Sequence, residues 1–191
     1  PNVAQLFDAG TTPEGNPFFV MGVGEGTRIA ADCDERRLPL AERLRLFLAV
    51  CDGVQHAHQK GVVHRDLKPS NILVAEPGGR PLPKVIDFGI AKALDQPLVE
   101  NDRTIGLVGT PGYVSPESIL ELAGATEADT RSDVYSLGVL LYELLAGTLP
   151  FASDVPRTEM LRQVRDLDPP APSARFAALE AREADEVAGE R

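Results

Sequence analysis

The sequence predicts one α+β domain in which short strands come first and helices dominate the later part of the chain. Of its 191 residues, 43% are hydrophobic and 25% are charged, a composition that suits a globular domain with a buried core. Strand-like runs flank a turn-rich stretch near the N-terminus, and helical apolar periodicity begins after residue 38. Separate groups of strands and helices are typical of the α+β class.

The first predicted elements are two strands that pair as an antiparallel hairpin. The runs "VAQLFDAG" (3–10) and "PFFVMGV" (17–23) read as strands, and "TTPEGN" between them is rich in turn-forming residues. We therefore expect a hairpin with a rather long connecting loop.

A long amphipathic helix is predicted within residues 38–61. Pro39 stands near its start and Gly61 just past its end, which are positions that these two residues favour. Apolar residues recur at spacings of three and four, as expected for one buried face. The residues of this predicted face are Leu40, Leu44, Phe47, Leu48, Cys51, Val54 and Ala57.

Short strands and a long loop are expected after this helix. The predicted strands cover residues 62–63, 72–74 and 84–86, and the turn-rich "EPGGRPLP" separates the last two. Residues 90–116 show no sustained periodicity. A loop of that length inside a domain usually carries function.

The C-terminal part is predicted to be helical. "SDVYSLGVLLYELLAG" is apolar on nearly every side, which predicts a buried helix capped by Ser132 and ended by Gly147. A shorter helix is expected at 157–166. The Pro-rich "DPPAPSAR" then precedes an acidic helical stretch at 177–191.

Charge and composition exclude several classes of protein. A formal net charge of −10 repels phosphate backbones, so we expect no nucleic-acid partner. Cys33 and Cys51 are too few for a disulfide framework or a zinc site and read as reduced thiols of a cytoplasmic protein. The longest apolar run, 136–147, is shorter than the ~20 residues of a membrane span. An anchor elsewhere in a longer protein is left open.

Polar groups gather in "GVVHRDLKPSNILV" (61–74) between two apolar runs, a pattern typical of a site. Transfer of a phosphoryl group to a hydroxyl needs a carboxylate facing the hydroxyl and a cation beside the moving phosphate. Asp66 and Lys68 supply these two groups, and Pro69 keeps their segment from becoming a helix. Mg²⁺ needs oxygen ligands, which Asn71 and Asp87 provide. Antiparallel pairing of the strands at 72–74 and 84–86 would bring those two residues to the same end of a hairpin.

Three motifs in order, "HRDLKPSN", "DFG" and "GTPGYVSPE", resemble the catalytic loop, the magnesium motif and the end of the activation segment of protein kinases. The chain is most similar to bacterial eukaryotic-like serine/threonine protein kinases. The resemblance implies a partial protein-kinase-like fold, with a remnant of the β small lobe and hinge at 1–24. A mainly α-helical large lobe would span 25–167, and a Pro-rich break with an acidic helical tail 168–191. We expect the Gly-rich loop and the ATP-binding strand lysine to precede Pro1.

The resemblance implies a role for each residue of the motifs. Asp66 would be the catalytic base and Lys68 the contact to the transferred phosphate of ATP, while Asn71 and Asp87 would hold Mg²⁺. The adenine would lie over Leu73. The gatekeeper and hinge of this nucleotide site would be Met21, Gly22, Val23 and Gly24, although hinges usually carry bulkier residues than these glycines.

Other residues would support the site. His64 and Phe88 would stack in the column that links the lobes, and Gly89 would permit a sharp turn. Asp133 would hold the backbone of the catalytic loop; a first-turn acid that complements the helix dipole is its simpler interpretation. Glu117 would pair with an arginine beyond residue 191. His56 and His58 lie two apart on a helix and read as surface or packing residues.

Regulation is predicted in the long loop. Arg65 could grip a phosphate on Thr104 and so order the loop, the alternative being a solvated threonine. Thr110 would lie near Asp66 and Lys68 and shape the place of the hydroxyl acceptor.

The function that we predict is transfer of the ATP γ-phosphoryl group to Ser/Thr hydroxyls of protein substrates, and a dimer for autophosphorylation is left open. One alternative is a pseudokinase that binds partners through its helical lobe. Another is a small-molecule phosphotransferase, which "GTPGYVSPE" disfavours because it builds a platform for peptides.

Overall fold

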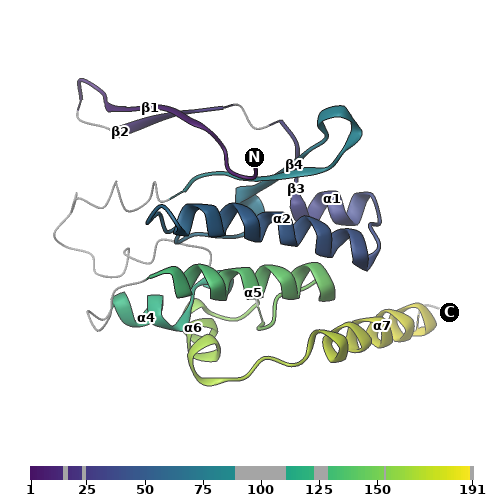
Figure 1. The fold of residues 1–191 in the computed structure, drawn as a ribbon. Coiled ribbons are helices and arrows are strands. Elements are labelled where there is room, and N and C mark those ends of the chain that lie inside the picture. Colours follow the sequence, from purple (N-terminus) through teal and green to yellow (C-terminus); the bar gives the residue numbers. More distant parts are fainter. Residues whose placement is uncertain (15–16, 23–24, 89–110, 123–128, 153, 190–191) are drawn as a thin grey trace.

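The computed structural model describes residues 1–14, 17–22, 25–88, 111–122, 129–152 and 154–189. The strands lie on one side of the structure and the helices on the other (Figure 1). This arrangement confirms the predicted α+β class. The predicted residues Val23, Gly24, Gly89, Thr104 and Thr110 lie outside the described ranges.

The predicted N-terminal hairpin is confirmed. Strand β1 (Leu6–Thr11) pairs antiparallel with β2 (Pro17–Met21), in a register that runs from the pair Leu6 and Met21 to the pair Thr11 and Pro17. The hairpin extends from the rest of the structure at the edge that carries the N-terminus (Figure 1).

A second sheet has the strand order β3–β4–β5. It consists of β3 (Thr27–Arg28), β4 (Ile72–Ala75) and β5 (Leu82–Val85), all antiparallel. The predicted pairing of the later two strands is thereby confirmed, while β3 had no clear signal in the sequence. The 3₁₀ turn η2 (Pro77–Gly79) connects β4 to β5.

The strand predicted at 62–63 is wrong, since these residues form no strand, and the free edge of β5 is occupied by residues 2–4. The N–H of Val85 donates to the Asn2 carbonyl at 2.9 Å, and the N–H of Ala4 donates to the Val85 carbonyl at 2.8 Å. Val62 instead closes the end of the preceding helix, with its N–H bonded to the Ala57 carbonyl at 3.0 Å. A Cβ at Gly53 would meet the Asn2 carbonyl oxygen at 2.8 Å, so glycine is required for this close approach.

The long helix is α2 (Leu40–His58), but part of its predicted buried face is wrong. Leu40 and Leu48 are 59% and 61% exposed, whereas Leu46 and Val50 are buried in the core. The helix has apolar residues around most of its circumference, so spacing alone could not select the face that meets β5 and α5. A short helix before it, α1 (Ile29–Glu35), was not predicted.

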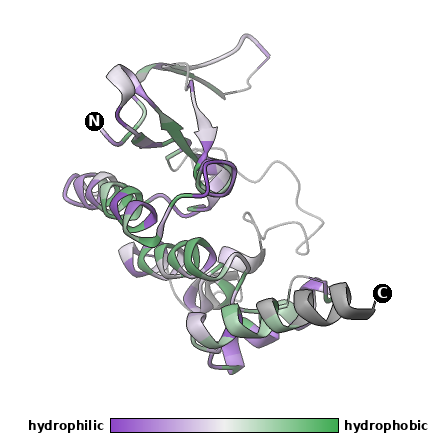
Figure 2. Cartoon of the chain, turned by 90° about the vertical axis from the view of Figure 1, so that its right-hand side faces the viewer, coloured by the Kyte–Doolittle hydropathy of each residue, from purple (hydrophilic) through white to green (hydrophobic). Residues whose placement is uncertain are grey.

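The buried helix is α5 (Thr130–Ala146), and Figure 2 shows that apolar residues dominate it. Its N-cap is Asp129 rather than Ser132, because the Asp129 carboxylate accepts from the N–H of Arg131 at 2.8 Å. Ser132 is buried in the first turn. The helix ends at Gly147 as predicted, with φ of 71°.

The remaining helices flank α5. Helix α4 (Pro116–Leu122) follows the 3₁₀ turn η3 (Pro111–Tyr113), and α6 (Arg157–Asp166) lies where the short helix was predicted. Helix α7 (Pro172–Gly189) starts inside the Pro-rich segment and packs on α5. Within the described ranges, no helix combines the length and the hydropathy that crossing a membrane would need.

The hydrophobic core joins the sheet to helices α1, α2 and α5. Every second residue of β4 and β5 is buried against these helices, so the other face of the sheet, which includes Leu73, is more exposed. The buried core residues are Ile29, Cys33, Leu46, Val50, Val54, Leu67, Ile72, Val74, Val85, Leu137, Leu140 and Leu144.

One glycine inside α5 and one at its C-cap give a matched prediction about backbone conformation. A Cβ added at Gly138 or at Gly147 would have no atom within 4 Å, so only backbone preference decides the effect of alanine. We expect Gly147→Ala to lower the free energy of unfolding by about 1 kcal/mol, because its φ is left-handed. Gly138→Ala, inside the helix, should raise it by roughly 0.5–1 kcal/mol. Urea unfolding would measure both, and equal effects of the two substitutions would contradict the prediction.

Candidate active site

The segment after His64 brings an acidic side chain and a basic side chain together. The Lys68 ammonium lies 2.7 Å from Oδ2 of Asp66, and both side chains are about one fifth exposed (21% and 22%). Pro69 begins the 3₁₀ turn η1 (Pro69–Asn71), which leads directly into β4. The pair is therefore accessible to a substrate while its backbone is anchored by the sheet.

Asn71 is buried and fixes the same acid from the other side. Its side-chain Nδ2 donates to the Asp66 carbonyl at 2.8 Å and lies 3.3 Å from Asp66 Oδ2. Oδ1 of Asn71 accepts from the Ser70 hydroxyl at 3.5 Å, and its second lone pair is left to bind a cation.

The register of the β4–β5 hairpin places Asp87 beside Asn71. Ile72 pairs with Val85, and the ladder continues as the Ile86 N–H donates to the Asn71 carbonyl at 2.9 Å. Asp87 follows immediately, so the two predicted metal ligands lie at the same end of the hairpin. One carboxylate and one amide oxygen fit Mg²⁺, which usually keeps several waters and adds substrate phosphate oxygens. Among the described residues, no group of three or more His, Cys, Asp or Glu side chains forms an alternative metal site.

His64 connects the segment that carries Asp66 to the segment that carries Asp87. Its Nε2 lies 2.9 Å from the Ile86 carbonyl, which can only accept, so Nε2 carries the proton and Nδ1 accepts the N–H of Asp66 at 3.3 Å. The ring packs against Phe88 in a tilted arrangement, with centroids 4.7 Å apart and an angle of 55° between the ring planes. Burial lowers the pKa of His64, partly opposed by the Ile86 carbonyl and by the charges of Asp133 and Asp66. The histidine is thus a neutral structural link.

Asp133, in the first turn of α5, holds the backbone at His64 and Arg65. Its side chain is fully buried and accepts the N–H groups of His64 and Arg65, each at 2.8 Å. A third partner is His58 at the end of α2, whose Nε2 lies 2.7 Å from Asp133 Oδ2. Sequence reasoning missed His58, because its partner is 75 residues away and no spacing rule connects them.

Two residues of the site have left-handed backbone conformations that are uncommon outside glycine. Arg65 has φ of 68° and Asp87 has φ of 61°. Such conformations cost free energy and persist where the surroundings hold them, often at functional sites. Arg65 directly precedes Asp66, and Asp87 is itself the second acid that the sequence singled out.

The predicted nucleotide side of the site is described in part. Met21 ends β2, and the Gly22 N–H donates to the Gln5 carbonyl at 3.0 Å, which anchors the start of the predicted hinge. Leu73 lies on the face of β4 opposite the buried Ile72 and Val74, as contact with a ligand would require. The predicted regulatory role of Arg65 stays a prediction, since Thr104 is outside the described ranges.

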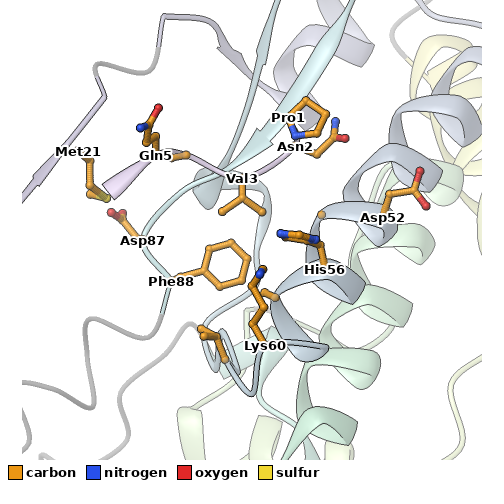
Figure 3. A pocket seen from close by; sticks show the side chains of 14 residues that line it. Pro1, Asn2, Val3, Gln5, Met21, Asp52, His56, Lys60, Asp87 and Phe88 are labelled. Atoms are coloured by element: carbon orange, nitrogen blue, oxygen red, sulfur yellow. The ribbon is translucent and has the colours of Figure 1, made fainter. Parts of the chain in front are cut away.

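A cavity of about 650 Å³ adjoins the site behind Asp87 (Figure 3). It lies between residues 1–5, one side of α2 and the segment after β5, and Phe88 points into it. Met21 and Asp87 line it, but Asp66, Lys68 and Asn71 do not. The cavity therefore touches the candidate active site only at its edge, at Asp87.

The segment "PGYVSPE" is fixed to α5 by buried polar contacts that sequence reasoning also missed. The Tyr113 hydroxyl donates to Glu143, and the Ser136 hydroxyl donates to the Tyr113 carbonyl at 2.8 Å. Burial and the adjacent Glu143 carboxylate raise the pKa of Tyr113. Glu117, in the first turn of α4, lies 3.5 Å from the Ser132 hydroxyl.

Comparison with known proteins assigns the chain to a family. The family model of the protein kinase domain matches residues 1–182 of the chain. The chain belongs to the protein kinase family. The matched residues include Asp66, Lys68, Asn71 and Asp87, so this family assignment and the geometry of the site concern the same part of the kinase chain.

Bacterial kinases are similar to this kinase chain over most of its length. It is 39% identical to the serine/threonine-protein kinase Pkn1 of Myxococcus xanthus over 184 residues, which is 94% of the chain. It is 37% identical to PknB of Mycolicibacterium smegmatis over 93% of the chain, and 36% identical to a probable serine/threonine-protein kinase of Clostridium perfringens over 87%. The matched regions cover 25%, 28% and 23% of those proteins, so the kinase chain spans about a quarter of their length.

Proposed function

We propose that the chain is the catalytic part of a serine/threonine protein kinase, which transfers the γ-phosphoryl group of ATP to hydroxyls of a protein substrate. The observation that carries this proposal is the Asp66 carboxylate, held 2.7 Å from the Lys68 ammonium and contacted by Asn71. The hairpin register adds Asp87 to the same end of the sheet. We further propose the division into a small-lobe remnant (1–24), a helical lobe (25–167) and a tail (168–191).

In the proposed reaction, a substrate hydroxyl donates its proton to Asp66 as its oxygen forms a bond to the γ-phosphorus. The bond between that phosphorus and the bridging oxygen of ADP breaks at the same time. Lys68 offsets negative charge on the transferred group. Asn71 Oδ1 and the Asp87 carboxylate would hold Mg²⁺, which neutralises phosphate charge when it is bound. The backbone after Met21 would face the adenine.

The test is a phosphotransfer assay on the full-length gene product that contains this chain. Incubated with Mg²⁺, ATP labelled at the γ-phosphate and dephosphorylated casein, it should place the label on serine and threonine. Chelation of Mg²⁺ with EDTA should abolish the transfer, because Asp87 and Asn71 then face the phosphates without a cation. Labelled free phosphate or labelled small molecules alone would contradict the proposal, and absence of any transfer would favour the scaffold alternative.

A further inference from the structure

Arg43, near the start of α2, has 19% of its side chain exposed and contacts three other segments of the chain. We propose that Arg43 is a positioning residue for nucleotide binding: its guanidinium holds α1 and the turn after it, and α1 in turn fixes β3 beside the predicted adenine site. This inference rests on the proposed function, because it assigns Arg43 an effect on the binding of ATP.

The argument starts from the hydrogen bonds of the Arg43 side chain. Nε donates to the Leu38 carbonyl at 3.0 Å, and Nη1 donates to the Leu144 carbonyl at 3.1 Å. Nη2 donates to the Cys33 carbonyl at 3.2 Å and to the Asp34 carboxylate at 2.8 Å. Cys33 and Leu144 lie in the last turns of α1 and α5, where helix carbonyls lack intrahelical partners and carry partial negative charge. A planar cation with several donors suits such a set of acceptors.

The second step concerns the turn between α1 and α2, which Arg43 closes. The Leu38 N–H donates to the Cys33 carbonyl at 2.9 Å, so the guanidinium reaches both ends of this turn. Arg37, inside the turn, has a left-handed φ of 49°, a conformation that persists where the surroundings hold it. Without the guanidinium, the turn would keep its backbone bonds but lose this link to α2 and α5. The end of α1 would then be held less firmly.

The third step connects α1 to the nucleotide side of the site. Helix α1 begins directly after β3, and Arg28 of β3 pairs with Leu73, the residue predicted to lie under the adenine. The helix also packs on β4, so a shift of α1 is passed to both strands. Asp66 is held by other contacts, from Lys68 and Asn71. We therefore expect a looser α1 to weaken nucleotide binding more than the chemical step.

The test compares substitutions of two arginines of α2 in the full-length gene product. Met resembles the unbranched stem of arginine but donates no hydrogen bond, so Arg43→Met removes these contacts with little loss of packing. We expect KM for ATP to rise by about tenfold, the equivalent of one hydrogen bond, with kcat within about twofold of the unsubstituted protein. Arg43→Lys keeps the charge and one donor group and should raise KM less. Arg45→Met is the control, because Arg45 is 69% exposed and pairs with Glu42 on the same helix.

Amide hydrogen exchange, followed by NMR, gives a readout that does not depend on phosphate transfer. In Arg43→Met, the N–H of Leu38 and the amides of β3 should exchange about tenfold faster, while the hairpin of β1 and β2 keeps its rates. If the unsubstituted protein transfers no phosphate, the proposed function fails and the exchange experiment alone decides this inference. Unchanged exchange in β3 would overturn it.

The kinetic outcomes decide equally clearly. An unchanged KM for ATP in Arg43→Met would overturn the inference, whatever happens to kcat or to the melting temperature, because Arg43 would then only stabilise the fold. An equal rise of KM in Arg45→Met would also overturn it, because that result would follow from the loss of any positive charge on α2.

Discussion

Asp66→Asn should reduce the rate of phosphate transfer by about 10²- to 10⁴-fold, the usual contribution of a positioned general base. The asparagine has the same shape and can still accept from Lys68 and Asn71, the two side chains that contact Asp66 in the structure. What it loses is the capacity to take the proton of the substrate hydroxyl. We therefore expect kcat to fall while KM for ATP and the melting temperature stay close to those of the unsubstituted protein.

The matched control for this variant is Asp168→Asn, an exposed carboxylate between α6 and α7 that contacts no part of the site. Initial rates at saturating ATP and Mg²⁺ would compare the three proteins. If Asp66→Asn and Asp168→Asn had the same kcat, Asp66 could not be the base. A large loss of thermal stability in Asp66→Asn would instead mean that its carboxylate charge holds the loop together.

Asp133→Ala should have the largest effect on stability, lowering the free energy of unfolding by roughly 3 kcal/mol or more. The substitution leaves the N–H groups of His64 and Arg65 buried without their acceptor, and it also removes the partner of His58. Each buried donor without a partner costs about 1–3 kcal/mol. Catalysis should fall as well, because the left-handed Arg65 backbone loses the bond that maintains it.

Two further variants make this result interpretable. Asp133→Asn keeps one carbonyl oxygen as an acceptor and should lose less stability than Asp133→Ala, so it keeps the comparison possible if the alanine variant does not fold. Asp129→Ala removes the exposed N-cap of the same helix and should cost about 1 kcal/mol. Chemical unfolding monitored by circular dichroism would rank the three. If Asp133→Ala were no less stable than Asp129→Ala, the buried carboxylate would not be the group that holds the loop.

The sequence was most informative where a local pattern determines the structure. The N-terminal hairpin and the pairing of β4 with β5 are confirmed, since turn residues between β-forming runs fix both the connection and its direction. From that pairing alone, Asn71 and Asp87 could be placed at one end of a hairpin. Their roles, like those of Asp66 and Lys68, stay proposals until the variants are measured.

The predictions that were wrong share a physical cause, because each concerns a feature that depends on contacts between distant segments of the chain. The buried side of α2 is selected by β5 and α5, so Leu40 and Leu48 were assigned to the wrong face. Val62 of the strand predicted at 62–63 is instead bonded to Ala57 at the end of α2, and residues 2–4 occupy the edge of β5. The hydrogen bond of His58 could not be predicted, because it depends on a partner that is close in space and not on the spacing of residues along the helix.

Residues 2–4 are hydrogen-bonded to β5, and this attachment has a mechanical consequence. Asn2 and Ala4 are bonded to Val85, two residues before Asp87, and the Asn2 side chain also donates to the Pro83 carbonyl at 2.9 Å. The carbonyl of Gln5, the next residue in the sequence, accepts the N–H of Gly22, which directly follows β2. Any force that pulls on the hairpin is therefore transmitted through these bonds to β5, and the proposed metal ligand Asp87 follows this strand. Breaking these bonds would uncouple the hairpin from β5.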